Sequence, residues 1–141
     1  MKKIAFFAAV AALASAAAHA QVTVDKPWVR TTVAQQTTTG AFMTITSAQG
    51  GKLVSASSPI AEAVEVHEMK MEGDVMKMRP VDALPLPAGK PVDLKSGSYH
   101  IMMMGLKAPV KAGDVVTIKL VVEDAKGKRE TVDVKAAARQ N

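Results

Sequence analysis

The chain has 141 residues, no cysteine, nine methionines and a formal net charge of +5. Only 4% of the residues are aromatic and no block of basic residues occurs, so the composition argues against a nucleic-acid-binding surface. The lack of cysteine excludes disulfides and the thiolate-ligated copper centre of blue-copper electron-transfer proteins.

Residues 1–20 have the pattern of a secretory signal peptide. Lys2 and Lys3 precede an apolar run over residues 4–18, and Ala18-His19-Ala20 is a small-x-small cleavage site. The apolar run is shorter than the roughly 20 residues that cross a bilayer as a helix. We therefore expect cleavage after Ala20 and export across one membrane. The expected mature chain, residues 21–141, has no membrane span, and loss of the two lysines lowers its formal net charge to +3.

Short apolar segments alternate with turn residues through the whole expected mature chain. Strands are predicted over residues 22–24, 28–33, 41–46, 52–57, 63–71, 75–79, 92–94, 99–106, 115–123 and 129–135. Strands at this spacing, with turns between them, predict one all-β domain with a sandwich or small-barrel architecture.

Between these strands the sequence predicts several interruptions. Pro27 is expected to break the first strand pair, and residues 35–40 form a polar loop. Residues 80–91 contain four prolines and are expected to form a loop or irregular edge, because proline cannot donate to a central ladder. Residues 61–63 could form one helical turn, and residues 136–141 are expected to fray.

The segment from His67 to Met104 concentrates imidazole and thioether side chains. Residues 63–71 and 75–79 are predicted to pair around Gly73-Asp74. With those two residues at the centre of the turn, the cross-strand pairs are Met71–Met76, Met69–Met78 and His67–Pro80. His67 and Met78 then lie diagonally on one face, whereas a one-residue shift would put them on opposite faces.

A second strand carries the motif His100-Ile101-Met102. Because side chains alternate along a strand, His100 and Met102 share one face while Ile101 points to the other. If the fold brings the two segments together, His67, Met78, His100 and Met102 can form a four-coordinate site with two nitrogen and two sulfur ligands. Thioether sulfur and neutral imidazole favour Cu(I), with zinc a second choice and the oxygen-seeking Mg²⁺ and Ca²⁺ disfavoured.

A purely structural interpretation competes with the metal site. Methionine often fills irregular cores, and Met43, Met103 and Met104 are expected to lie in the core, while Met76 fits either interpretation. A β-sandwich without any metal therefore stays open as an alternative. An enzyme is disfavoured, because the expected mature chain has two histidines and no cysteine, which offer few candidates for acid–base or nucleophilic chemistry.

The spacing of the four candidate ligands resembles a known family. His67-x10-Met78-x21-His100-x-Met102 is similar in every interval to the motif of the periplasmic copper chaperones called PCuAC. The flanking segments Pro27-Trp28-Val29-Arg30 and Gly113-Asp114-Val115 resemble the family as well. The likeness extends through nearly the whole expected mature chain.

This resemblance implies a cupredoxin-like Greek-key β-sandwich that binds one Cu(I) through His67, Met78, His100 and Met102. Met69 stands where the family often has an additional methionine and is a candidate auxiliary ligand. The resemblance further implies delivery of copper to the CuA centre in subunit II of cytochrome c oxidase, sometimes alongside a thioredoxin-like copper protein. A role in periplasmic copper tolerance or scavenging is the alternative.

The C-terminal segment departs from some family members, which carry a His/Met-rich tail that binds further copper. Here the chain ends in residues 135–141, which contain neither histidine nor methionine. We therefore expect one bound ion per chain and no tail-assisted capture.

Overall fold

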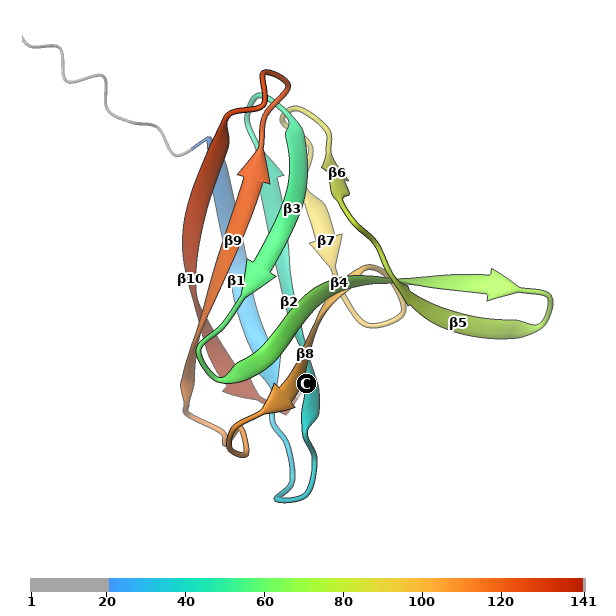
Figure 1. Ribbon diagram of the computed structural model, residues 1–141, viewed down its shortest axis with the longest axis vertical. Coiled ribbons are helices and arrows are strands. Elements are labelled where there is room, and N and C mark those ends of the chain that lie inside the picture. The colour runs from blue at the N-terminus through green and yellow to red at the C-terminus, as the bar shows by residue number, and fades with distance from the viewer. Residues whose placement is uncertain (1–20, 141) are drawn as a thin grey trace, which may run out of the picture.

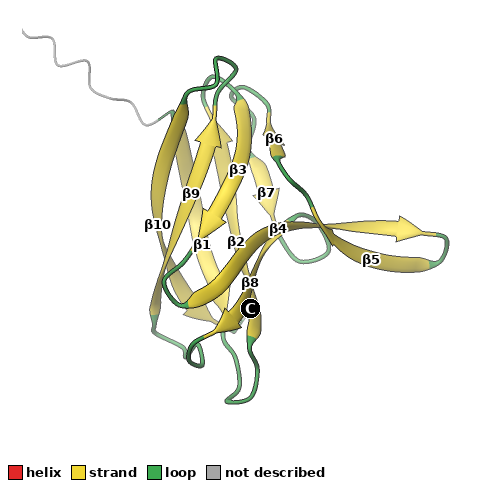
Figure 2. Cartoon of the chain, in the orientation of Figure 1, coloured by secondary structure: helices red, strands yellow, loops and turns green. Residues whose placement is uncertain are grey.

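The computed structural model describes residues 21–140; the predicted signal peptide lies outside the described residues. In chain order the strands are β1 (Val22–Arg30), β2 (Thr38–Ser47), β3 (Gly51–Ser57), β4 (Ala61–Glu72), β5 (Val75–Pro80), β6 (Leu84–Leu86), β7 (Val92–Leu94), β8 (His100–Leu106), β9 (Val115–Glu123) and β10 (Arg129–Arg139). All the regular elements in residues 21–140 are strands (Figure 2). No helix in this range is long and apolar enough to cross a membrane.

The strands form one continuous hydrogen-bonded sheet in the order β5-β4-β8-β2-β1-β10-β9-β3-β6, with β7 pairing to β2. The sheet curls back on itself, so that β9 and β3 lie in front of β1 and β2 (Figure 1). This arrangement confirms the predicted all-β sandwich. One part departs from the compact body: the β4–β5 hairpin extends away from the sandwich (Figure 1).

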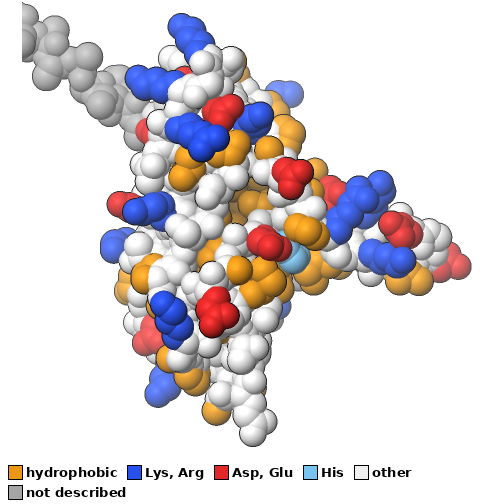
Figure 3. Space-filling model, viewed as in Figure 1, with side chains coloured by type: hydrophobic (Ala, Val, Ile, Leu, Met, Phe, Trp, Pro, Cys, Tyr) orange, Lys and Arg blue, Asp and Glu red, His pale blue; other side chains and the backbone are white. Residues whose placement is uncertain are grey.

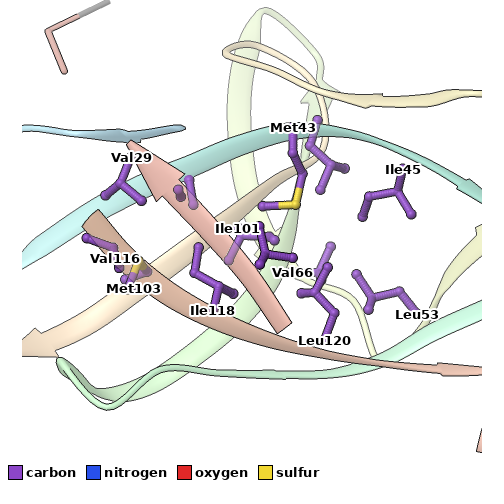
Figure 4. Packing of buried hydrophobic residues seen from close by; sticks show 14 of the residues in the cluster. Val29, Met43, Ile45, Leu53, Val66, Ile101, Met103, Val116, Ile118 and Leu120 are labelled. Carbon is purple, nitrogen blue, oxygen red and sulfur yellow. The ribbon is translucent and has the colours of Figure 1, made fainter. Parts of the chain in front are cut away.

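The core fills the space between the two layers of the curled sheet. Strict alternation along β9 buries Val116, Ile118, Leu120 and Val122, which are at most 3% exposed. Opposite them lie the inward side chains of β2 and β8 (Figure 4). Met43 and Met103 are 3% and 0% exposed and belong to this core, as the sequence predicted. Met104 does not, because it is half-buried on the opposite face of β8.

The N-terminal strand is longer and less regular than expected. β1 continues from Val22 to Arg30, whereas separate strands were predicted on either side of Pro27. The chain passes Pro27 through a bulge between Asp25 and Trp28, where Lys26 has a φ of 48°. A bulge removes the unpaired proline position from the ladder and lets the strand resume.

The predicted fraying of the C-terminus is wrong for residues 136–139. β10 continues to Arg139 and pairs in parallel with β1, with Trp28 opposite Ala137 and Arg30 opposite Arg139. Ala136 and Ala138 are buried against the core. A short alternating alanine segment buries little apolar area, so its order depends on this pairing with a strand more than 100 residues earlier in the sequence.

Three smaller expectations are also corrected. β2 begins at Thr38, inside the predicted loop, because its first residues pair with β8. Ala61 starts β4 opposite Leu106 and does not enter a helical turn. The proline-rich segment contains the short strand β6, which pairs with β3 at the edge of the sheet, the position that proline tolerates.

Candidate metal site

The two histidines meet across adjacent strands. β4 and β8 pair antiparallel, and in their register His67 lies directly opposite His100. The centroids of the two imidazole rings are 6.0 Å apart. Two imidazoles that share one ion through bonds of about 2 Å have centroids roughly 5–6 Å apart. The observed separation of 6.0 Å lies at the upper end of the range that a shared ion allows.

The hairpin register brings thioethers to the same face as the imidazoles. β4 and β5 are joined by the two-residue turn Gly73-Asp74, and Met69 pairs with Met78 while His67 pairs with Pro80, as predicted. Gly73 has a φ of +62°, in the left-handed region that glycine adopts at no steric cost. The turn thus sets the parity that places Met78 diagonally to His67.

A hollow of about 290 Å³ opens on this face. Four of the side chains that line it carry soft or borderline donors: Met69, Met78, His100 and Met102. His67 does not line the hollow but packs beside His100, at its edge. A larger hollow, of about 610 Å³, lies around Gln21 and the β9–β10 turn, and neither histidine nor methionine lines it. The fold therefore gathers all five predicted residues at one place.

Burial differs sharply between the two imidazoles and Met78, while Met69 and Met102 are half-buried. His100 is 6% exposed and the His67 side chain 11%, whereas Met78 is 48% exposed. Figure 3 shows a histidine beside an acidic side chain and several apolar ones where the hairpin leaves the body. The arrangement combines two fixed imidazoles with a thioether that remains open to solvent.

Each imidazole has one nitrogen engaged by an oxygen acceptor. Nδ1 of His100 lies 3.0 Å from the carbonyl oxygen of Ser98. Nε2 of His67 lies 2.9 Å from a carboxylate oxygen of Glu65. Because these oxygens only accept, the imidazole N–H must donate in each case when the ring is neutral. The remaining lone pairs are Nε2 of His100 and Nδ1 of His67.

The free nitrogen of His67 has no compensating contact. Its Nδ1 atom is buried and has no hydrogen-bond partner among the described residues. A buried unpaired polar nitrogen costs about 1–3 kcal/mol, which a metal–nitrogen bond would offset. Histidine ligands commonly donate their second ring nitrogen to a carboxylate or a carbonyl. Both imidazoles follow that pattern.

The sequence analysis missed Glu65 as a partner of His67. Glu65 precedes His67 by two residues on the same strand, so both side chains lie on one face. Period-two spacing from a candidate ligand is the signal that could have identified it. Glu65 also lies opposite Met102 in the β4–β8 ladder, which places it at the edge of the same cluster.

The far wall of the hollow is aromatic and cationic. The Phe42 ring lies 6.4 Å from the His100 ring and 4.6 Å from the Trp28 ring, measured between centroids. The guanidinium of Arg30 lies 5.1 Å from the centre of the Phe42 ring. Gly40 makes room for this wall, because a Cβ there would come within 2.9 Å of the ring. Of these side chains, Phe42 lies nearest the imidazoles and covers one side of the His100 ring.

The donor set selects for a soft ion. Within residues 21–140 no group of three or more His, Asp or Glu side chains is placed to hold a metal. The histidines are accompanied by thioethers, which bind Cu(I) in preference to oxygen-seeking cations. Four uncharged donors would leave a monovalent ion with its own single charge.

Comparison with known proteins agrees with this architecture. The family model described as "LpqE-like: Putative lipoprotein LpqE-like" matches residues 22–136. The chain belongs to this family. It is the family of the PCuAC domains, so the resemblance seen in the motif spacing is confirmed at the level of the family.

One curated relative of this LpqE-like chain is "Putative lipoprotein Lxx21020" of Leifsonia xyli subsp. xyli (strain CTCB07). The two are 32% identical over 117 residues, which cover 81% of this chain and 69% of the relative. The solution structure of CuI-DR1885 from Deinococcus radiodurans is 30% identical, with a TM-score of 0.65 over 91% of this chain and 87% of that one.

The apo PCuAC domain from PmoF1 shows the fold. Its TM-score is 0.67 at 17% identity, over 86% of this LpqE-like chain and 95% of that domain. PCuAC domains are cupredoxin-like β-sandwiches, and this likeness confirms the fold class predicted from the sequence.

Proposed function

We propose that this LpqE-like protein is a non-enzymatic copper carrier that binds one Cu(I) tightly through His67, Met78, His100 and Met102, with Met69 as an auxiliary ligand. The observation that carries the proposal is the direct pairing of His67 with His100, beside a hollow lined by three thioethers. The copper(I) form of the related DR1885 supports Cu(I) as the ion.

A structural β-sandwich without metal fits the site less well. A core role would bury the thioethers, but Met78 is 48% exposed. A lone core histidine would have both ring nitrogens satisfied, whereas Nδ1 of His67 has no partner among the described residues. This unpaired nitrogen supports a site completed by a ligand that the protein alone does not supply.

Release of the ion follows from the same geometry. Thioethers leave a metal without taking up a proton, so Met78 at the exposed side can be replaced by a ligand of an acceptor protein in one exchange step. The buried imidazoles hold the ion until a second acceptor ligand arrives. Each exchange forms one metal–ligand bond as another breaks, and copper stays in the +1 state throughout.

The proposed cellular role is copper delivery in the periplasm, after removal of residues 1–20 as a signal peptide. The proposed acceptor is subunit II of cytochrome c oxidase, at its CuA centre, with a thioredoxin-like copper protein as a possible partner in the transfer. The family membership and the relative's description as a lipoprotein support export.

The test is transfer of copper between isolated proteins. The Cu(I)-loaded chain is mixed anaerobically with a soluble CuA domain of oxidase subunit II, and copper in each protein is measured after separation. We expect copper to move to the acceptor from the wild type and not to be carried there by His100→Ala. Retention of all copper by the wild type would contradict delivery and favour a role in tolerance or scavenging.

A further inference from the structure

The β4–β5 hairpin has two chemically distinct faces. One face presents charged side chains joined across the strands, with ion pairs of 3.1 Å between Lys77 and Glu72 and 2.7 Å between Arg79 and Glu68. The other face is formed by methionines. Between Glu68 and Arg79, charged and methionine side chains alternate along both strands and so lie on opposite faces. Val75, next to the turn, is the one uncharged side chain on the charged face.

The methionines form two successive cross-strand pairs. Met69 lies opposite Met78, next to the histidines, and Met71 lies opposite Met76, nearer the tip. Directly opposed residues have Cβ atoms about 4.5–5.5 Å apart, and diagonal neighbours about 7–8 Å. The flexible side chains of Met69, Met71 and Met76 can therefore bring three sulfur atoms to one point.

Packing does not explain the outer pair. Met71 and Met76 are 57% and 48% exposed, and neither belongs to the hydrophobic core. The hairpin extends from the body, so its methionine face has no sheet over it (Figure 1). Exposed apolar side chains gathered on one face of a projecting hairpin call for a ligand or partner, and the feature of methionine that leucine lacks and that can bind a ligand is the thioether sulfur.

We propose that Met69, Met71 and Met76 form a second, weaker Cu(I) site on the hairpin, from which the ion passes to the inner site through Met78. A site of three thioethers is uncharged and selects for Cu(I) over harder cations. Movement inward exchanges the sulfur of Met76 for that of Met78, with one Cu–S bond formed and one broken and no change of oxidation state. This revises the expectation of one ion per chain.

The proposal concerns the same soft-metal chemistry as the proposed function and shares Met69 with it, but Met71 and Met76 belong to the outer site alone, so the two can fail separately. Cu(I) is titrated anaerobically into protein labelled with ¹³C at the methionine methyl groups. We expect the Met78 and Met102 signals to move with the first equivalent and those of Met71 and Met76 with the second. The core residues Met43 and Met103 serve as internal controls.

Substitutions on the hairpin test the number of Cu(I) ions that the chain binds. Met71→Leu/Met76→Leu keeps the apolar surface but removes two sulfur atoms, and we expect it to bind one equivalent where the wild type binds two. Val75→Leu, which alters an exposed residue at the same tip, should still bind two. A double variant that still binds two, or a wild type in which the Met71 and Met76 signals never move, would overturn the outer site. If Cu(I) moves the Met71 and Met76 signals but never those of Met78 and Met102, the result counts against the inner site only.

Discussion

Glu65 shows how a single carboxylate can prepare a ligand. Its oxygen lies 2.9 Å from Nε2 of His67, which fixes the ring orientation and leaves Nδ1 as the free donor. Ser98 serves His100 in the same way through its carbonyl oxygen. The two imidazoles therefore leave different ring nitrogens free, Nδ1 in His67 and Nε2 in His100.

Replacing Glu65 should weaken copper binding without unfolding the protein. We expect Glu65→Ala to lower Cu(I) affinity about 10- to 100-fold, the usual effect of losing a partner that orients a histidine ligand. Competition against a Cu(I) chelator of known affinity measures the change. Glu68→Ala is the matched control, since Glu68 lies on the other face of β4 and pairs with Arg79. Equal losses in both variants would contradict an orienting role for Glu65.

Neighbouring methionines on β8 test strand parity. Met102 lines the hollow, whereas Met103 is fully buried in the core. Met103→Leu conserves volume and should cost under about 1.5 kcal/mol of stability while leaving copper affinity unchanged. Met102→Leu should keep stability and lose affinity. Thermal unfolding together with chelator competition separates the two effects, and the reverse pattern would mean that the faces are wrongly assigned.

At the scale of elements, the β4–β5 hairpin decides whether the site can form. Its register depends on a turn of two residues, and a shift by one residue would move Met78 to the charged face. Because the hairpin extends from the body, few core contacts correct an error in this register (Figure 1).

The turn can be perturbed selectively at Gly73, whose φ is +62° and whose Cβ position is open. We expect Gly73→Val to cost about 1–2 kcal/mol locally, since a β-branched residue resists this conformation. Gly73→Asn should cost less, because asparagine tolerates it. Amide hydrogen exchange in β5 should accelerate in the valine variant alone, with weaker Cu(I) binding. Equal exchange in the two variants would show that the turn does not set the register.

Local pattern predicted the strands that alternate and the hairpin that closes on Gly73-Asp74. It also separated Met102 from Met103, because parity along one strand needs no knowledge of the fold. It failed for the end of β10, whose alanines gain their order from parallel pairing with β1. The meeting of β4 with β8, which places His67 opposite His100, is likewise a long-range pairing. In the sequence, only the resemblance of the ligand spacing to the PCuAC motif implied that these two strands meet.

At the scale of the whole molecule, the chain holds its site without disulfides. One curled sheet supplies a dry core on one side of β8 and the imidazole–thioether face on the other. The first and last strands, β1 and β10, pair with each other, and the Trp28–Phe42 wall beside His100 lies on β1 and its other neighbour, β2. In the proposed carrier, the body would hold the ion through its imidazoles and the projecting hairpin would exchange it through Met78.

Copper affinity of the whole protein should depend on pH. A proton competes with Cu(I) for each imidazole, so affinity falls as the solution is acidified and rises as the rings lose their protons. With two imidazole ligands, the logarithm of the affinity should change by about two per pH unit at the acid end. Chelator competition between about pH 5 and 8 measures this slope. An affinity that does not vary with pH would mean that thioethers alone bind the ion.

The most direct test of the account is the Cu(I) affinity of His100→Ala and Met102→Ala, measured anaerobically against a competing chelator. Both residues line the hollow at the centre of the site, and one supplies nitrogen where the other supplies sulfur. Met103→Leu, with its side chain in the core, is the control. We predict a large loss of affinity in both alanine variants and none in the control. Unchanged affinity in both alanine variants would contradict the assignment of this face as the copper site.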